Sequence, residues 1–256
     1  MTAQRTDKLS EAARALEGAR FLSFWLDDPD RPQPAPALAQ DIDTDLLIVG
    51  GGISGICLAA QLHRKKIDDF IILEKSGDIG GTWHDNTYPG CGCDIPSLLY
   101  SFSFAVNVAW TRKYAPQAEI LKYFNDCVDQ FSLRDKFYFG QSVTKARWDA
   151  VDKRWEIITA KGDIIRCDYF VSAVGQLSRP SLPKIDGLET FEGQAFHSAR
   201  WPTTFDPTNK TIGVVGNGAS AIQIVPEIAK SAKRVKIFQR SPNWILPRHD
   251  HRYGAF

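Results

Sequence analysis

The fold of this 256-residue chain follows from one stretch, Asp45-Leu-Leu-Ile-Val-Gly50-Gly-Gly-Ile-Ser-Gly55. A short apolar run that stops at a glycine is typical of a buried parallel strand. The glycines then fit G-x-G-x-x-G and open a predicted helix over 53–65. A second apolar run, Asp69–Glu74, predicts the next parallel strand. The order of strand, glycine turn, helix and strand predicts a Rossmann-like dinucleotide-binding unit.

Each glycine of this turn has a separate physical role. Gly50 permits the tight turn, Gly52 lets a pyrophosphate approach the N–H groups at the helix N-terminus, and Gly55 lets the helix pack closely on the strand. Glu74 follows about 20 residues later and can accept hydrogen bonds from ribose hydroxyls. The turn and the acid are therefore candidate residues for binding FAD or NAD.

A second unit of the same kind begins with the apolar run Lys210–Gly216. The stretch Gly216-Asn-Gly-Ala-Ser-Ala221 reads G-x-G-x-x-A, an accepted variant of the motif, and it precedes a predicted helix over 220–230 and a strand over 235–239. Arg240 follows this strand, at the position that Glu74 occupies in the first unit. An arginine at this position accommodates a 2′-phosphate. The second unit is therefore predicted to bind NADP. Its candidate residues are Gly216, Gly218, Ser220 and Arg240.

An antiparallel meander is expected between the two units. After an amphipathic helix over 117–131, three strand signals separated by turns cover 142–148, 154–159 and 164–174. The last of them ends in a buried run that stops at Gly175. The predicted fold class is α/β, with two Rossmann-like dinucleotide-binding units, the first carrying the inserted meander and the second only partial.

The predicted domain organisation has four parts. The first, residues 1–40, is an N-terminal arm with a helical stretch over 9–26 and a proline-rich linker. The first dinucleotide-binding domain covers 41–185, a linker covers 186–209, and the partial second domain covers 210–256.

Composition excludes several classes of protein. The formal net charge of +1 gives no basic field for nucleic acid and no charged surface for a membrane. No signal peptide is visible, and the longest apolar run, 46–60, is too short to span a bilayer. The chain has five cysteines, an odd number, and their spacing matches no disulfide framework. This pattern is typical of reduced thiols. We therefore expect a cytoplasmic protein.

Two further segments have an unusual composition. The first is a long loop from Gly80-Gly-Thr-Trp83 to Ser97, and loops of this length are usually functional. The second lies between the glycine motifs and is Phe191-Glu-Gly-Gln-Ala-Phe-His-Ser-Ala-Arg-Trp-Pro202, which reads F-x-G-x-x-x-H-x-x-x-W-P. This pattern resembles the fingerprint of the type I Baeyer–Villiger monooxygenases, which use FAD and NADPH.

The resemblance covers roughly residues 42–248 and corresponds to the N-terminal half of that family. It extends to the segments 80–83, 88–94, 100–104 and 239–244. It implies that the first turn and its acid hold FAD, and that the second turn and its arginine hold NADPH. Trp83 and Tyr100 would line the flavin. The further cofactor-binding positions are Gly81, Thr82, Asp94 and Val143.

The same resemblance implies roles for two catalytic residues. Asp94 would lie near the flavin–nicotinamide contact and adjust the charge of a catalytic arginine. His197 would couple domain movement to catalysis, although it also fits a hydrogen-bonded structural histidine. In the implied reaction NADPH reduces FAD and the reduced flavin reacts with O₂. One oxygen atom is then inserted next to the carbonyl of a small-molecule ketone, which gives an ester or a lactone.

The chain departs from the family pattern in two respects. The run Ser172-Ala-Val-Gly175 stands where the family usually has alanine, threonine and glycine, so a threonine hydroxyl is lost. The family's chains are also much longer, and their remaining part would supply the catalytic arginine and close the FAD domain. Because an isolated strand–helix–strand unit leaves an unpaired sheet edge, we expect the chain to be a fragment, a truncated gene product or one piece of a split enzyme. A second chain that supplies the missing half is a candidate partner.

Other functions fit parts of the pattern. A pyridine-nucleotide disulphide oxidoreductase would have its redox cysteine where this chain has Trp83, so we reject that function. Zinc binding by Cys91 and Cys93 lacks a second pair of ligands. A flavin monooxygenase that oxidises nitrogen or sulfur shares both glycine motifs, although Trp201-Pro202 favours the Baeyer–Villiger branch. A further alternative is that the chain is a non-catalytic subunit or remnant that binds FAD or NADP.

Overall fold

The computed structural model describes Leu38 and residues 41–254. The predicted N-terminal arm, with its helical stretch over 9–26, lies outside the described residues except for Leu38.

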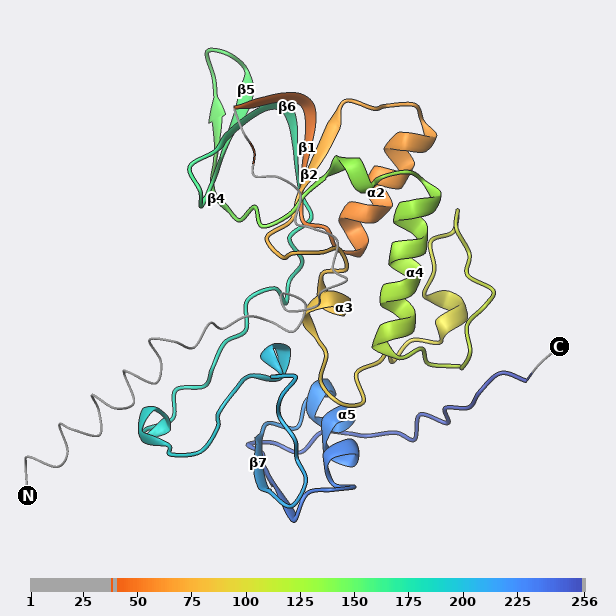
Figure 1. Cartoon of the computed structure of the whole chain (residues 1–256), viewed down its shortest axis with the longest axis vertical. Helices are drawn as coiled ribbons and strands as arrows, with labels where there is room; N and C mark the ends of the chain where they lie inside the picture. The colour runs from red at the N-terminus through yellow and green to blue at the C-terminus, as the bar shows by residue number, and fades with distance from the viewer. Residues whose placement is uncertain (1–37, 39–40, 255–256) are drawn as a thin grey trace, which may run out of the picture. The chain divides into compact units, whose positions relative to one another are not determined.

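A six-stranded mixed sheet forms the centre of the first unit (Figure 1). Its strand order is β3-β2-β1-β6-β5-β4, so β1 lies between β2 and β6. β1 pairs in parallel with both neighbours, and β4, β5 and β6 form the antiparallel meander. The bounds are β1 Ile42–Val49, β2 Phe70–Leu73, β3 Phe137–Tyr138, β4 Val143–Asp149, β5 Arg154–Thr159 and β6 Ile164–Ser172. This arrangement confirms the predicted α/β fold class with its inserted meander.

The strand β6 joins the two parts of this sheet. It closes the meander against β5 and also pairs with β1, where Val49 lies opposite Ser172. The sequence patterns did not predict the two-residue strand β3, which extends the parallel part beyond β2. The buried run expected up to Gly175 is wrong in part, because the side chains of Tyr169 and Val174 are mostly exposed.

Successive side chains of β1 point to opposite faces of the sheet, as the pleat of a strand requires. Ile48 packs in a core cluster with the helices α2 and α4, whereas Leu47 and Val49 belong to a second cluster with residues of the meander. Figure 1 shows α2 and α4 side by side, and residues of the two helices contact one another. The helix bounds are α2 Ile53–Arg64, α3 Thr82–Asp85 and α4 Gln117–Gln130. Short 3₁₀ turns are η2 Ser97–Leu99, η3 Arg134–Lys136, η4 Leu188–Thr190 and η5 Ser198–Arg200.

The second unit is a parallel pair of strands joined by one helix: β7 Thr211–Val215, α5 Ala219–Ile228 and β8 Arg234–Phe238. Residues of one face of this pair, including Ile212 and Val235, pack toward the core that contains Ile224 and Ile228. Residues of the other face, including Phe238, are exposed within the described part of the chain. Parallel strands are normally covered on both faces, so this unit presents an open face.

Among the described residues, no helix combines the length and apolar character that crossing a membrane requires.

Candidate functional site

The first glycine turn is held together by close backbone contacts. Gly50 has a φ of +115°, and its N–H donates to the carbonyl of Leu73 at 2.8 Å. A Cβ atom at Gly50 would lie 2.4 Å from the carbonyl oxygen of Ala173, and one at Gly55 would lie 2.0 Å from the carbonyl oxygen of Gly50. Both positions therefore require glycine for the fold itself, as the motif predicts.

Gly52 is different, because its surroundings would admit a side chain. The nearest atom to a Cβ atom there is the Cα of Gly81 at 3.5 Å, which is an ordinary contact distance. Its backbone, with φ −83° and ψ −168°, is open to any residue. No side chain of the described residues caps the N-terminus of α2 at this glycine. The fold does not require a glycine at position 52, and the start of the helix has no side-chain cap. Both features are compatible with the close approach of a pyrophosphate.

We expect Gly55→Ala to destabilise the chain by about 1–3 kcal/mol, because the new methyl group overlaps the carbonyl of Gly50 and forces the backbone apart. Thermal unfolding followed by circular dichroism measures the effect as a fall of several degrees in Tm. Gly218→Ala is the matched control, since nothing lies within 4 Å of its added Cβ atom and its Tm should not change. An unchanged Tm for the Gly55 variant contradicts the packing argument.

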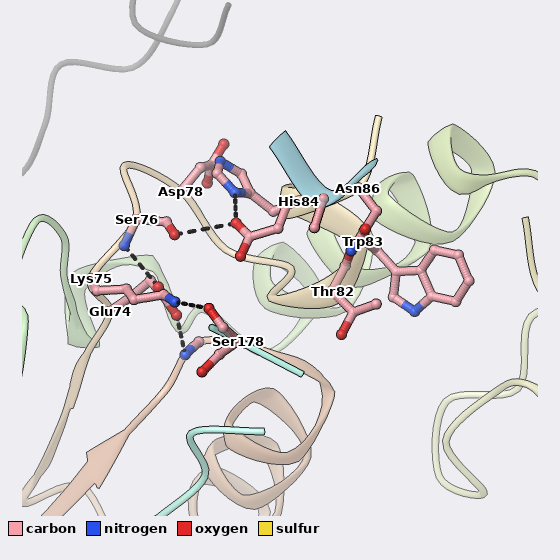
Figure 2. A network of polar contacts seen from close by, with 12 residues as sticks. Glu74, Lys75, Ser76, Asp78, Thr82, Trp83, His84, Asn86 and Ser178 are labelled. Atoms are coloured by element: carbon pink, nitrogen blue, oxygen red, sulfur yellow. Dashed lines mark hydrogen bonds and ion pairs between the residues drawn. The ribbon is translucent and has the colours of Figure 1, made fainter. Parts of the chain in front are cut away.

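Glu74 is buried beside this turn, and backbone N–H groups hold its carboxylate. Its Oε2 accepts from the N–H of Gly51 at 2.6 Å, and its Oε1 accepts from the N–H of Ser76 at 2.8 Å. Figure 2 shows this carboxylate next to Ser76. Each oxygen has a second lone pair, so the carboxylate can still accept from the hydroxyls of a ribose. The geometry is therefore compatible with the predicted role of Glu74.

Gln141 is a buried residue near this acid that the sequence patterns did not single out. Its N–H donates to the carbonyl of Glu74 at 2.9 Å. Its side-chain Oε1 and Nε2 are buried and have no hydrogen-bond partner among the described residues. Leaving a buried polar group unsatisfied costs about 1–3 kcal/mol, so this amide suits a partner from outside the described part of the chain. A single glutamine carries no motif, so spacing alone offered no signal for it.

Trp83 and Tyr100, predicted to line the flavin, lie together. The indole Nε1–H of Trp83 donates to the phenol oxygen of Tyr100 at 2.9 Å, and their rings meet edge to face at 5.7 Å. The amide of Gln117, at the start of α4, donates to the carbonyl of Trp83. Burial raises the pKa of Tyr100, which the Trp83 hydrogen bond opposes and the charge of the exposed Asp94 reinforces. The structure therefore brings Trp83 and Tyr100 together, and the role of Asp94 stays a prediction.

The remaining predicted positions of the first site are Gly81, Thr82 and Val143. Gly81 has a φ of +53°, and the neighbouring Gly80 donates its N–H to the carbonyl of Gly51 at 2.9 Å. This contact holds the loop against the glycine turn, with the exposed Thr82 opening α3. Val143 is half-buried at the start of β4. No contact of the described residues assigns Val143 to a ligand, and its role stays a prediction.

The fingerprint segment forms a compact aromatic turn. The rings of Phe196, Trp201 and Phe205 meet edge to face with centroids 5.0–5.5 Å apart. The Nδ1 of His197 accepts from the N–H of Ala199 at 3.0 Å and so caps η5. This contact gives His197 a structural function, and its predicted role in coupling domain movement stays a prediction.

Two cations hold the segment after β6 against earlier parts of the chain. Lys75 donates to the carbonyl of Ser178 at 2.8 Å, which Figure 2 shows next to Glu74. Arg200, within the fingerprint, lies 3.8 Å from the carboxylate of Asp85 on α3. Burial alone would raise the pKa of Asp85, but the hydrogen bond with His84 and the charge of Arg200 lower it overall. Asp85 is therefore held as a carboxylate under the linker.

The second glycine turn repeats the geometry of the first. Gly216 has a φ of +105° and donates its N–H to the carbonyl of Phe238 at 2.8 Å. A Cβ atom at Gly218 would meet nothing within 4 Å, so the start of α5 is open. Arg240 is exposed and makes no hydrogen bond or ion pair with the described residues, which leaves its guanidinium available. Ser220 lies in the first turn of α5, and its role in nucleotide binding stays a prediction.

A sequence model of the pyridine nucleotide-disulphide oxidoreductase family matches residues 47–254. The chain belongs to this family. All five cysteines of this chain are free thiols. Trp83 is bonded to Tyr100, so the structure gives no support for a redox disulphide after the GGT turn.

Curated members of the family with similar sequences are monooxygenases. A Baeyer-Villiger monooxygenase of Streptomyces coelicolor is 47% identical over 79% of this chain and 39% of its own length. A Baeyer-Villiger monooxygenase of Pseudomonas aeruginosa is 42% identical over 85% of this chain and 41% of its own length. The chain thus spans about 40% of the length of these relatives. The predicted resemblance to Baeyer–Villiger monooxygenases is confirmed.

Solved structures agree with this relationship. The closed crystal structure of cyclohexanone monooxygenase superposes with a TM-score of 0.79 and 34% identity, over 84% of this chain and 41% of that one. A crystal structure of OTEMO in complex with FAD and NADP superposes with a TM-score of 0.78 and 34% identity, over 82% of this chain and 41% of that one. The two-unit Rossmann-type fold is therefore the fold of flavin monooxygenases.

Proposed function

We propose that this chain forms the FAD-binding part and the first half of the NADPH-binding part of a Baeyer–Villiger monooxygenase. One observation carries the proposal: two glycine turns of the same geometry are joined by a linker that contains the F-x-G-x-x-x-H-x-x-x-W-P pattern. The monooxygenase names of the relatives support it. The substrate would be a small-molecule ketone with O₂ as co-substrate, and the product an ester or lactone.

In this proposal the first turn holds FAD. The N–H groups at the start of α2 bind its pyrophosphate, the carboxylate of Glu74 accepts from its ribose, and the amide of Gln141 is a further candidate contact. Bound flavin supplies the redox chemistry with oxygen. Trp83 and Tyr100, fixed by their mutual hydrogen bond, exclude water from one side of the flavin site. Asp94 places a negative charge at the edge of this site.

The second turn holds NADPH in the same way. The open start of α5 binds the pyrophosphate, and the exposed Arg240 binds the 2′-phosphate. The open face of β7 and β8 fits the relatives' greater length, since the rest of a monooxygenase would cover it. That part comes either from the same polypeptide or from a second chain. We place the protein in the cytoplasm because its cysteines are free.

The absorption spectrum of the purified chain, with chromatographic identification of released flavin, tests the first step. We expect a flavin spectrum with about one FAD per chain, because the turn, the acid and the Trp83 loop are all present. Anaerobic addition of NADPH should then bleach the flavin if the second turn is sufficient. A folded but colourless chain contradicts FAD binding by these residues alone.

Product analysis separates the proposed reaction from oxidation of nitrogen or sulfur. The chain, completed by the part that its relatives carry, is given a cyclic ketone and a thioether in parallel. We expect a lactone from the ketone at a higher kcat/KM than a sulfoxide from the thioether. Sulfoxide as the sole product overturns the Baeyer–Villiger assignment and keeps the flavin assignment.

A further inference from the structure

Gln223 on α5 makes three hydrogen bonds to a loop of the first unit. Its Oε1 accepts from the hydroxyl of Tyr88 at 3.0 Å and from the N–H of Gly92 at 3.3 Å. Its Nε2 donates to the carbonyl of Gly92 at 2.8 Å. The side-chain amide thus pairs with both polar groups of one backbone residue more than a hundred positions away in sequence. Such a paired amide fixes distance and orientation together.

The loop approaches α5 more closely than a side chain would allow. Gly90 has a φ of +80°, and a Cβ atom there would lie 2.6 Å from the carbonyl oxygen of Gln223 and 2.9 Å from the Cγ of Glu227. Tyr88 is buried, and it shares a core cluster with Ile224 and Ile228 of α5. The contact between the loop and α5 is therefore a packed interface that also contains the hydrogen bonds of Gln223.

The other side of the same loop is attached to the start of α4. The N–H of Cys93 donates to the carbonyl of Ala115 at 2.9 Å, and the N–H of Gln117 donates to the carbonyl of Cys91 at 2.9 Å. Gln117 also donates to the carbonyl of Trp83. The loop 88–93 is thus held between α4 and α5, and Asp94 follows it directly. A shift of α5 would be transmitted to Asp94 through this loop.

Tyr88 contacts α5 one turn after the glycine turn of the second unit. Its hydroxyl donates to Gln223, which lies three positions after Ser220 on the same face of α5. Burial raises the pKa of Tyr88 to about 12, so the phenol stays protonated and can donate. Ser220 lies two residues after Gly218, which starts the helix. A phosphate bound at this helix start would therefore lie about one helical turn before Gln223.

We propose that Gln223 is a positioning residue, which couples occupancy of the nucleotide site at the start of α5 to the placement of the Asp94 loop. The coupling rests on the proposed function, because it needs a nucleotide at the second turn. The placement of the loop by Gln223 does not need one. Gln223 reaches Asp94 through Gly92 and has no contact with the reacting atoms.

Amide hydrogen exchange at Gly92, measured by mass spectrometry on fragments covering 88–94, tests the placement. In Gln223→Ala we expect exchange at Gly92 to speed up about tenfold, because its N–H and carbonyl both lose their partner. Gln223→Glu should restore part of the protection, since a carboxylate accepts from Gly92 and Tyr88 but cannot donate. Lys230→Ala, which removes only an exposed pair with Glu227 on the same helix, is the control and should match the wild type.

The same measurement with NADP⁺ tests the coupling, with binding followed separately by calorimetry. We expect NADP⁺ to change the exchange at Gly92 at least threefold in the wild type and to leave it unchanged in Gln223→Ala, although the variant still binds NADP⁺. Binding without a change at Gly92 in the wild type overturns the coupling. Wild-type exchange at Gly92 in both Gln223 variants overturns the placement. Absence of NADP⁺ binding overturns the second nucleotide site and the coupling with it, whereas the placement is still decided by the variants without nucleotide.

Discussion

Gly52→Val is expected to remove FAD from the chain while leaving its fold intact. The added Cβ atom has room, because its nearest neighbour is 3.5 Å away, and the backbone is extended, as valine prefers. Its methyl groups would lie over the N–H groups that bind the pyrophosphate. Loss of about two hydrogen bonds to a charged group predicts an affinity for FAD about 100-fold lower or worse. The flavin-to-protein ratio after gel filtration measures the loss, and circular dichroism checks the fold.

The matched control for this experiment is Gly218→Val in the second turn. Its position has the same backbone conformation, and nothing lies within 4 Å of the added Cβ atom. This variant should keep the flavin of the wild type. If the Gly52 variant keeps a full complement of FAD, the first turn is not the flavin site.

Arg240→Ala is expected to separate the two nicotinamide cofactors. A charge-assisted contact with a phosphate contributes about 1.5–3 kcal/mol, so the Kd for NADPH should rise about 10- to 100-fold. NADH has no 2′-phosphate, and its Kd should stay within about threefold. Because Arg240 is exposed and bonded to no described residue, its removal should not disturb the fold. Fluorescence titration with both cofactors provides the measurement.

Arg234→Ala serves as the control for general electrostatics. Arg234 is also exposed and begins the strand β8, so its removal changes the net charge by the same amount. We expect it to leave the ratio of NADPH to NADH affinity unchanged. An equal loss of both cofactors in Arg240→Ala would falsify the assignment of the 2′-phosphate site.

The sequence predicted those parts of the fold that depend on local pattern. The glycine turns were predictable because the carbonyls of Gly50 and Ala173 leave no room for a Cβ atom, and the motif encodes this requirement. The strand β3 was not predictable, because two residues carry no period and Phe137 becomes a strand residue only by pairing with β2. The exposure of Tyr169 was also missed, since an apolar run does not reveal which face the rest of the chain covers.

The same distinction applies to the candidate site. Glu74 and Arg240 were found from their positions at the ends of strands, and their geometry fits the predicted roles. Gln141 and Gln223 were missed because the burial of the first and the paired hydrogen bonds of the second depend on residues far away in the sequence. A glutamine has no spacing rule, so only the folded chain shows that these amides are buried or paired across elements. That Trp83 and Tyr100 line one site was expected from the family resemblance alone, and the structure places their side chains in contact.

The central place of β1 has a consequence for how the chain folds during synthesis. β1 pairs with β6, whose first residue follows the last residue of β1 by more than a hundred positions. Until β6 emerges from the ribosome, the apolar strand β1 remains an unpaired sheet edge, and such edges promote aggregation. Closure of this long-range pairing is also slow. A nascent chain stopped ahead of Ile164 is therefore expected to aggregate, whereas one that has passed Ser172 can complete the sheet.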